Sequence, residues 1–329
     1  MNILITCCLG DHIRSNVNDI RNAYPDCKII GVDMREMHFN HNGLDGFYRV
    51  PKCDDEKYVG SVLDVCKLED INVVVSFSSL DIVPFAERKD DFDKLGVAVT
   101  LCSSSGTIVA NYKQMFYCAC EGTGIKIPKT SKMFLKSTQV LEWMDSNNVN
   151  EVVTKVPNST GAKNIGRYKK EYLKSHVFDF EQPVIAQEML SGIEYSVDCF
   201  CMKGKVVFGC VKKNYEMDLG VSIYSEIVDR SDIIDLCAPA CELFRLDGLV
   251  GFDLKEDSEG NVYIIECNPR PTATISLVSK AGVNLLKHMI EYYVTGDTCF
   301  DNESLDYGLK IARFREDYYF KEVPDVWKR

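Results

Sequence analysis

Two apolar runs in the C-terminal third of the chain are separated by a short polar turn. The runs are LVGFDLK (249–255) and VYII (262–265), and the turn is EDSEGN. Apolar runs around a glycine-containing turn of this kind predict a β-hairpin. With Glu259 and Gly260 at the tip, the carboxylate of Asp253 lies opposite that of Glu266.

The same register fixes which side chains share a face of the hairpin. Lys255 lies opposite Ile264, and Pro269 favours an extended Asn268, so the second strand continues to that residue. Because side chains alternate along a strand, we expect one face to carry Val262, Ile264, Glu266 and Asn268. An apolar strand would then run directly into polar side chains.

Carboxylates that face each other across a hairpin repel, because their Cβ atoms lie only about 5 Å apart. A divalent cation between them would remove that repulsion. Asp253, Glu266 and Asn268 offer only oxygen ligands, which Mg²⁺ prefers and which it shares with phosphates. A slipped register would instead turn one carboxylate to solvent. The hairpin alone leaves both interpretations open.

The length and composition limit the class of protein. A chain of 329 residues with 46% hydrophobic residues predicts two domains with ample core. The net charge of −11, without a Lys/Arg-rich block, argues against nucleic acid or an anionic membrane as partner. We find no apolar run of membrane-spanning length and no signal peptide.

The 15 cysteines are an odd number, and without a signal peptide they indicate free thiols in a reducing cytoplasm. Cys199 and Cys201 share one face of a predicted strand, and Cys237 and Cys241 share one face of a predicted helix. We interpret both pairs as core packing rather than chemistry.

Residues 1–100 alternate strand and helix. Strands are expected at NILITC, CKIIGVD, INVVVSF and GVAVTL, and helices near 14–24, 55–69 and 80–94. This order predicts a parallel sheet covered on both faces, as in a Rossmann-like layer. Asp33 ends the second strand, where a dinucleotide-binding protein has its ribose-binding acid. The first turn, CCLGDH, lacks the G-x-G-x-x-G fingerprint, so we do not expect NAD.

The pattern changes after residue 130. Helical turns are expected over 103–130, and consecutive strands follow with hairpin spacing, which indicates an α+β body. We expect these strands at 151–156, 184–189, 193–202, 204–212, 221–228, 247–255 and 261–267, with helices near 137–147, 168–176 and 230–244 and a last helix at 283–296.

Two further segments carry candidate ligands for an anion and a base. Lys155 ends an apolar strand and precedes Ser159, Thr160 and Gly161, whose backbone N–H groups could hold a phosphate. The segment 187–190, Gln-Glu-Met-Leu, could present main-chain groups to an adenine edge, and Glu194 could accept ribose hydroxyls. Taken alone, the Lys155 segment is a weak signal, because surface lysines are common at strand ends. An ordinary hairpin with a solvated glutamate is the favoured interpretation of the second segment when it is taken in isolation.

Taken in order, the segments form a pattern. A Rossmann-like front is followed by Lys113 in NYK, Lys155 with its Ser/Gly loop, QEML-G-E, GFDL and EGNVYIIECNPRP. This order resembles the ATP-grasp superfamily, in particular stand-alone proteins similar to modules of the carbamoyl-phosphate synthetase large subunit. The resemblance is most specific in EGNVYIIECNPRP. It departs from the family in the phosphate loop, which here has one glycine before Ile165.

The resemblance implies a fold and a division of the chain. The fold is α/β plus α+β: a Rossmann-like pre-ATP-grasp domain at 1–105 and an ATP-grasp domain at 106–329. The ATP-grasp domain would consist of two α+β lobes that clamp ATP, a small lobe at about 130–190 and a large lobe at about 191–329.

The resemblance also implies roles for single residues. Arg270 and Lys155 would be catalytic, and Asp253, Glu266 and Asn268 would ligate Mg²⁺. ATP would be bound by Lys113, Lys155, Ser159, Thr160, Gly161, Gln187, Glu188, Met189, Leu190 and Glu194.

The function that follows is an ATP-dependent carboxylate–amine (or carboxylate–thiol) ligase with ATP and Mg²⁺ as cofactors. Such an enzyme forms an acyl phosphate and releases ADP and phosphate. We expect a small metabolite, an amino acid or a sugar acid as substrate, an amine as nucleophile, and a cytoplasmic location; a homodimer is compatible with such a chain. The alternative is a degenerate ATP-binding regulatory protein without ligase turnover, which the single-glycine loop favours.

Overall fold

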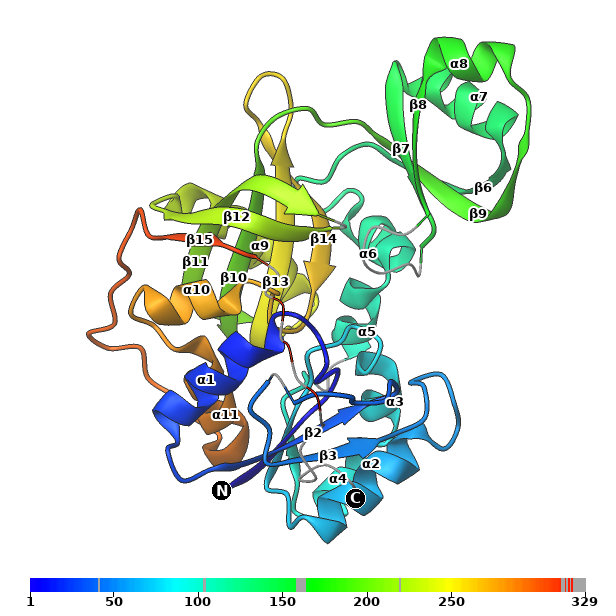
Figure 1. Ribbon diagram of the computed structural model, residues 1–329. Helices are drawn as coiled ribbons and strands as arrows, with labels where there is room; N and C mark the ends of the chain where they lie inside the picture. Colours follow the sequence, from blue (N-terminus) through cyan, green and yellow to red (C-terminus); the bar gives the residue numbers. More distant parts are fainter. Residues whose placement is uncertain are drawn as a thin grey trace.

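A computed structural model describes residues 1–40, 42–102, 105–157, 164–218, 220–314, 317, 319 and 321. It contains a five-stranded parallel sheet, a four-stranded antiparallel sheet and a six-stranded antiparallel sheet, in that order along the chain (Figure 1). The predicted fold class, a Rossmann-like layer followed by two α+β lobes, is confirmed. The division at residue 105 and the lobe boundaries stay predictions.

The front sheet has the strand order β3-β2-β1-β4-β5 and is parallel throughout. Its elements are β1 (Asn2–Ile5), α1 (Ile13–Ala23), β2 (Lys28–Asp33), β3 (Gly46–Arg49), α2 (Tyr58–Leu68), β4 (Val73–Val75), α3 (Ile82–Glu87), α4 (Lys89–Lys94) and β5 (Ala98–Val99). The edge strand β3 was not predicted, since its GFYR sequence lacks a buried apolar run. The helix expected at 80–94 is two helices, which meet at Arg88.

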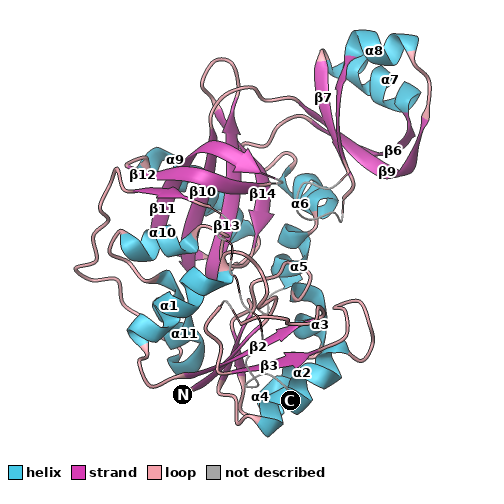
Figure 2. Ribbon diagram, in the orientation of Figure 1, coloured by secondary structure: helices cyan, strands magenta, loops and turns pink. Residues whose placement is uncertain are grey.

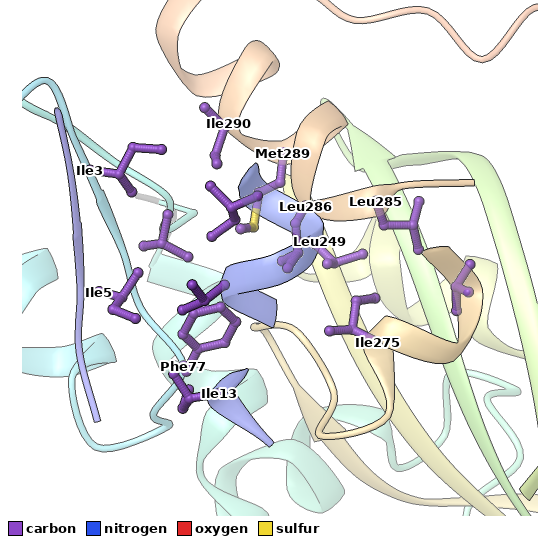
Figure 3. Packing of buried hydrophobic residues seen from close by; sticks show 14 of the residues in the cluster. Ile3, Ile5, Ile13, Phe77, Leu249, Ile275, Leu285, Leu286, Met289 and Ile290 are labelled. Carbon is purple, nitrogen blue, oxygen red and sulfur yellow. The ribbon is translucent and has the colours of Figure 1, made fainter. Parts of the chain in front are cut away.

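One face of this sheet packs on the C-terminal part of the chain. Ile3 and Ile5 of β1 belong to the same buried cluster as Ile13 of α1 and Met289 and Ile290 of α11 (Leu285–Thr295) (Figure 3). A short helix, α10 (Ile275–Lys280), also contacts α1. This shared core joins the front sheet to the large sheet through side chains far apart in the sequence.

The small lobe follows the helices α5 (Ser105–Asn111) and α6 (Lys113–Cys120). Its strand order is β6-β9-β7-β8, and its elements are β6 (Thr130–Lys136), α7 (Ser137–Asn147), β7 (Glu151–Lys155), β8 (Ile165–Lys169), α8 (Lys170–Ser175) and β9 (Asp179–Glu188). Helices α7 and α8 lie on the side of the small sheet that is turned away from the large sheet (Figure 2). The edge strands β6 and β8 were not predicted, because most of their side chains are exposed.

The large sheet has the strand order β14-β13-β10-β11-β12-β15. Its elements are β10 (Glu194–Met202), β11 (Lys205–Asp218), β12 (Val221–Val228), α9 (Ser231–Leu243), β13 (Gly248–Glu256), β14 (Val262–Asn268) and β15 (Lys310–Ala312). Helix α9 covers one face, and the cysteine pairs of β10 and α9 are fully buried there within a single apolar cluster. Their interpretation as core packing is confirmed.

The β13–β14 hairpin has the predicted pairing of Asp253 with Glu266, but not the predicted register at its tip. Lys255 pairs with Tyr263 rather than Ile264, because a β-bulge at Ile265 takes up one residue. The expectation that Ile264 and Glu266 share a face was therefore wrong. The bulge keeps Val262, Ile264 and Cys267 in the core and turns Glu266 and Asn268 to the opposite face.

That opposite face of the large sheet is polar even at its centre. Lys212 of β11 and Asp198 of β10 form an ion pair in which both side chains are fully buried, and Lys212 Nζ also donates to Thr272 Oγ1 at 2.6 Å. Asp198 Oδ1 has no hydrogen-bond partner within the described part of the chain. The pair joins two central strands to the loop that follows β14.

Replacing one member of this ion pair should lower the free energy of unfolding more than replacing both. Lys212→Met leaves Asp198 buried and uncompensated, which we expect to cost about 3–5 kcal/mol. The double change Lys212→Met with Asp198→Leu should restore most of that loss, since an apolar pair of similar volume needs no solvation. Urea unfolding of the three proteins measures the difference; equal stability of the single and double variants would contradict the interpretation.

Candidate active site

A cavity of about 480 Å³ lies between the small lobe and the polar face of the large sheet. Every predicted site residue within the described ranges lines it: Lys113, Lys155, Gln187, Glu188, Met189, Leu190, Glu194, Asp253, Glu266, Asn268 and Arg270. Ser159, Thr160 and Gly161, predicted for the phosphate loop, lie outside the described residues. The fold thus gathers the predicted side chains from five strands, a helix and two loops around one space.

The carboxylate end of the cavity is held by hydrogen bonds to Asp253. Ser196 Oγ donates to Asp253 Oδ1 at 2.9 Å, and Asn268 Nδ2 lies 3.4 Å from Asp253 Oδ2. Burial raises the pKa of Asp253 to about 7, and the facing charge of Glu266 contributes to the rise. The cross-strand repulsion expected from the sequence is therefore present in the fold.

Glu266 is the carboxylate that has a cationic partner. Lys113, the first residue of α6, places its Nζ 3.0 Å from Glu266 Oε1. One turn further along, the Tyr117 hydroxyl donates to the carbonyl oxygen of Ile265. Residues four apart share a helix face, so α6 contacts both the bulge and the carboxylate that the bulge turns outward.

Arg270 is held by the loop that follows β14 and by the front domain. Its Nε donates to Ser79 Oγ at 2.7 Å, and its Nη1 donates to the carbonyl oxygen of Pro271 at 2.8 Å. Ser79 follows β4, and its hydroxyl also donates to Asn268 Oδ1 at 3.3 Å. Sequence reasoning missed Ser79, although the run SFSSL at the carboxyl end of a parallel strand is a place where ligands commonly bind.

Lys155 lies in the wall of the cavity that the small lobe forms. It is only 8% exposed, and its Nζ donates to Gln187 Oε1 at 2.8 Å. Burial lowers its pKa to about 8, against the attraction of Glu266. Gln187 is fixed in turn because its Nε2 donates to Thr130 Oγ1 at 2.9 Å. The structure thus assigns Gln187 a contact with Lys155 that the sequence had not indicated.

The segment 188–190 lines the cavity where β9 ends, but part of its hydrogen-bonding capacity is in use. The Met189 amide donates to the carbonyl oxygen of Glu151 at 2.9 Å. Glu188 Oε1 accepts from the Lys129 amide at 2.7 Å. An adenine bound here would have to use other main-chain groups of the segment. Its predicted role stays a prediction.

Glu194, predicted for ribose, is paired with a residue that sequence reasoning missed. Lys255 lies opposite Glu194 in the β10–β13 ladder, and its Nζ is 3.3 Å from Glu194 Oε2. Both side chains line the cavity. Other missed lining residues are Val153, Ile165, Arg167, Ser196, Met217, Gly220, Val221, Ser222, Ile265, Thr272, Ala273 and Thr274. Alternation on β7 was a usable signal for Val153, two positions before Lys155.

A second cavity of about 560 Å³ adjoins the first and shares Ser79, Lys113, Glu266 and Asn268 with it. Its further walls come from the loop before α2, from α3 and from the residues between α5 and α6. Besides the shared Glu266, four carboxylates line it, Asp54, Asp55, Glu56 and Glu87, together with the guanidinium of Arg88. Lys113, Glu266 and Asn268 therefore stand between two spaces, each large enough for a small molecule.

The donor set fits a hard divalent cation. Asp253, Glu266 and Asn268 supply carboxylate and amide oxygens from one face of the hairpin, and Mg²⁺ commonly takes one or two carboxylates together with waters and phosphates. Within the described residues, no group of three or more His, Cys, Asp or Glu side chains is arranged to hold a metal. Two carboxylates and one amide oxygen leave coordination positions of the cation that waters and phosphate oxygens could fill. Within the described part of the chain, no helix is both long enough and apolar enough to cross a membrane.

Two family models match the chain. Residues 3–100 match "PylC-like, N-terminal domain", and residues 180–315 match "ATP-grasp in the biosynthetic pathway with Ter operon". A curated carbamoyl phosphate synthase large chain from Methanosarcina barkeri is 31% identical over 136 residues, which are 37% of this chain and 32% of that protein. The match thus spans about a third of that relative's length.

Solved structures agree on the fold. The chain superposes on biotin carboxylase from Campylobacter jejuni with a TM-score of 0.71 at 11% identity, over 92% of this chain and 73% of that one. An L-amino acid ligase from Bacillus licheniformis gives 0.64 at 13% identity, over 89% and 74%. The chain has the ATP-grasp fold, its residues 180–315 match an ATP-grasp family model, and it is distantly similar to the carbamoyl-phosphate synthase large chain.

The raised pKa of Asp253 predicts how pH changes the stability of the metal-free protein. The native state retains a proton between about pH 4 and pH 7 that the unfolded chain releases, so the free energy of unfolding falls as pH rises through this window. Asp253→Asn removes this dependence. Unfolding measured in EDTA should show the variant gaining stability relative to the wild type from pH 4 to pH 7, and a constant difference would contradict the assignment.

Proposed function

We propose that the protein is an ATP-dependent carboxylate–amine (or carboxylate–thiol) ligase that passes through an acyl phosphate and releases ADP and phosphate. The observation that carries the proposal is the pair of adjoining cavities with Lys113, Glu266 and Asn268 in their shared wall. One cavity has the lining that the ATP-grasp resemblance implies for a nucleotide. The other cavity adjoins the end of the first where the phosphates of ATP would lie, and it could hold a second substrate.

The cations of the site would act on the phosphates of ATP. Lys155 is buried and has a lowered pKa, so an anion near its Nζ favours its charged form. Arg270 is held by Ser79, which limits the directions in which its guanidinium can point. Fixed positive charge of this kind stabilises the charge that develops during phosphoryl transfer. Mg²⁺ held by Asp253, Glu266 and Asn268 would neutralise phosphate charge at the same place.

The Lys113–Glu266 ion pair would be exchanged when nucleotide binds. Lys113 would turn to a phosphate oxygen, and Glu266 would become available as a metal ligand. In the observed pair, each charge compensates the other at 3.0 Å. The pair therefore holds both side chains at the phosphate end without leaving either charge uncompensated.

The second cavity supports an amine as nucleophile. Its lining has five carboxylates, counting Glu266, against the two cations Arg88 and Lys113, so its charge is negative and favours a cationic amine. Apolar side chains of Val59, Leu80, Val83 and Pro84 also line it and could contact an organic body. After losing a proton to one of these carboxylates or to water, the amine would attack the acyl phosphate from the side of Lys113 and Glu266 and displace phosphate to form an amide.

A regulatory ATP-binding protein without turnover is the second candidate. The observation that favours it is the single glycine in the phosphate loop, in a segment outside the described residues. Such a protein would be stabilised by ATP with Mg²⁺ but would show no substrate-dependent ADP release.

The acyl phosphate can be trapped. With ATP, Mg²⁺ and a panel of small carboxylates, hydroxylamine should yield a hydroxamate, and ¹⁸O from the carboxylate should appear in inorganic phosphate. Lys155→Met should lower trapping by about 10²–10³-fold, because one charge-stabilising group is lost. Lys169→Met, which changes an exposed lysine of the same lobe, should not. Label recovered in AMP would contradict the mechanism, and MgATP binding without any hydroxamate would favour the regulatory alternative.

A further inference from the structure

A line of hydrogen-bonded side chains crosses four strands of the large sheet and ends on Asp253. Ser196 Oγ of β10 donates to Asp253 Oδ1 at 2.9 Å, and Asn214 Nδ2 of β11 donates to Ser196 Oγ at 3.0 Å. Ser225 Oγ of β12 donates to Asn214 Oδ1 at 2.9 Å, and the hydroxyls of Ser222 and Ser225 are hydrogen-bonded. All four residues before Asp253 are at most 7% exposed.

The chemistry of these groups gives the line one direction. An ionised Asp253 can only accept, so it takes the single proton of Ser196. Ser196 Oγ must then accept, which turns the amide nitrogen of Asn214 toward it and the amide oxygen toward Ser225. The proton of Ser225 is thereby used, and Ser222 donates to Ser225. Hydrogen bonds aligned in this way polarise one another, and the last acceptor is the carboxylate.

Stability alone does not explain so many polar groups at the centre of a sheet. On the other face of the same strands, Val197, Val211 and Phe252 are apolar and buried. Apolar side chains on the cavity side would avoid the cost of desolvating four polar groups. What the polar residues provide is a fixed position for the oxygens of Asp253, which faces Glu266 across the hairpin.

We propose that Ser196, Asn214 and Ser225 are positioning residues that hold Asp253 in the orientation in which it binds the metal–nucleotide complex. The inference rests on the proposed function, because it assumes that Asp253 is a metal ligand. Partners that orient a metal ligand typically change metal affinity by about 10–100-fold when they are removed. Removing these partners should weaken the metal-dependent part of nucleotide binding and leave the contacts with the adenine ring unchanged.

Three disruptive substitutions and one conservative substitution test the line. Ser196→Ala removes the donor to Asp253. Asn214→Asp keeps the size and the acceptor for Ser225, but it cannot donate to Ser196 and competes with Asp253 for the Ser196 proton. Ser225→Ala removes the donor to Asn214 Oδ1. Because Ser225 is farther from Asp253 along the line than Ser196 and Asn214, this change should have the smallest effect. Ser196→Thr keeps the hydroxyl on a strand that tolerates β-branched residues and should restore binding.

The measurement is calorimetric binding of a non-hydrolysable ATP analogue, once with Mn²⁺ and once in EDTA. Ser196→Ala and Asn214→Asp should weaken binding of the Mn²⁺ complex by about 10–100-fold and change binding of the metal-free analogue by less than about twofold. Ser137→Ala is the matched control, because it removes a buried hydroxyl that accepts from Phe178 N in the small lobe, away from the cavity.

The outcomes separate the two proposals. If the wild type binds the Mn²⁺ complex no better than the metal-free analogue, the metal site and this inference both fail. If the wild type shows metal-dependent binding and Ser196→Ala retains it, only the inference fails. A loss of affinity in Ser137→Ala equal to that in Ser196→Ala would likewise overturn it, since general destabilisation would then explain the effect.

Discussion

The site depends on one unfavourable contact, the apposition of Asp253 and Glu266 on neighbouring strands. The contact exists because the bulge at Ile265 moves Glu266 out of the face that Val262 and Ile264 occupy in the core. Helix α6 holds this arrangement from the side, through Tyr117 on the bulge and Lys113 on Glu266. The hydrogen-bonded line from Ser225 reaches Asp253 from the opposite direction. Both carboxylates are thus held from outside the hairpin.

The large sheet divides these tasks between its two faces. Its α9 face is apolar, carries Cys199 and Cys201 against the cysteines of α9, and contributes burial that stabilises the lobe. Its cavity face contains the Lys212–Asp198 pair, the serine–asparagine line and the Glu194–Lys255 pair, which add little stability by themselves. The front sheet contributes Ser79 to Arg270 and, through the core shared with α1 and α11, fixes its own place against the large sheet.

The sequence predicted the long buried elements and the side chains that line the cavity, for reasons that are physical. Alternation and apolar runs identify β10, β13 and β14, and the opposed pair at Asp253 and Glu266 survives the bulge. The tip register was wrong because no sequence signal distinguishes Ile265 as the extra residue. Edge strands such as β3 and β8 lack a buried run, and contacts such as Lys113 with Glu266 or Gln187 with Lys155 depend on tertiary packing. Local patterns do not encode such contacts.

The central claim is that the hairpin holds a metal ion against the phosphates of ATP. Crystals grown with Mn²⁺ and a non-hydrolysable ATP analogue, measured at a wavelength where manganese scatters anomalously, test it most directly. The account predicts an anomalous peak beside the side-chain oxygens of Asp253 and Glu266 and the phosphates of the nucleotide, with Lys113 moved from Glu266 to the nucleotide. Bound nucleotide without a peak at these carboxylates, and with the Lys113–Glu266 pair intact, would contradict it.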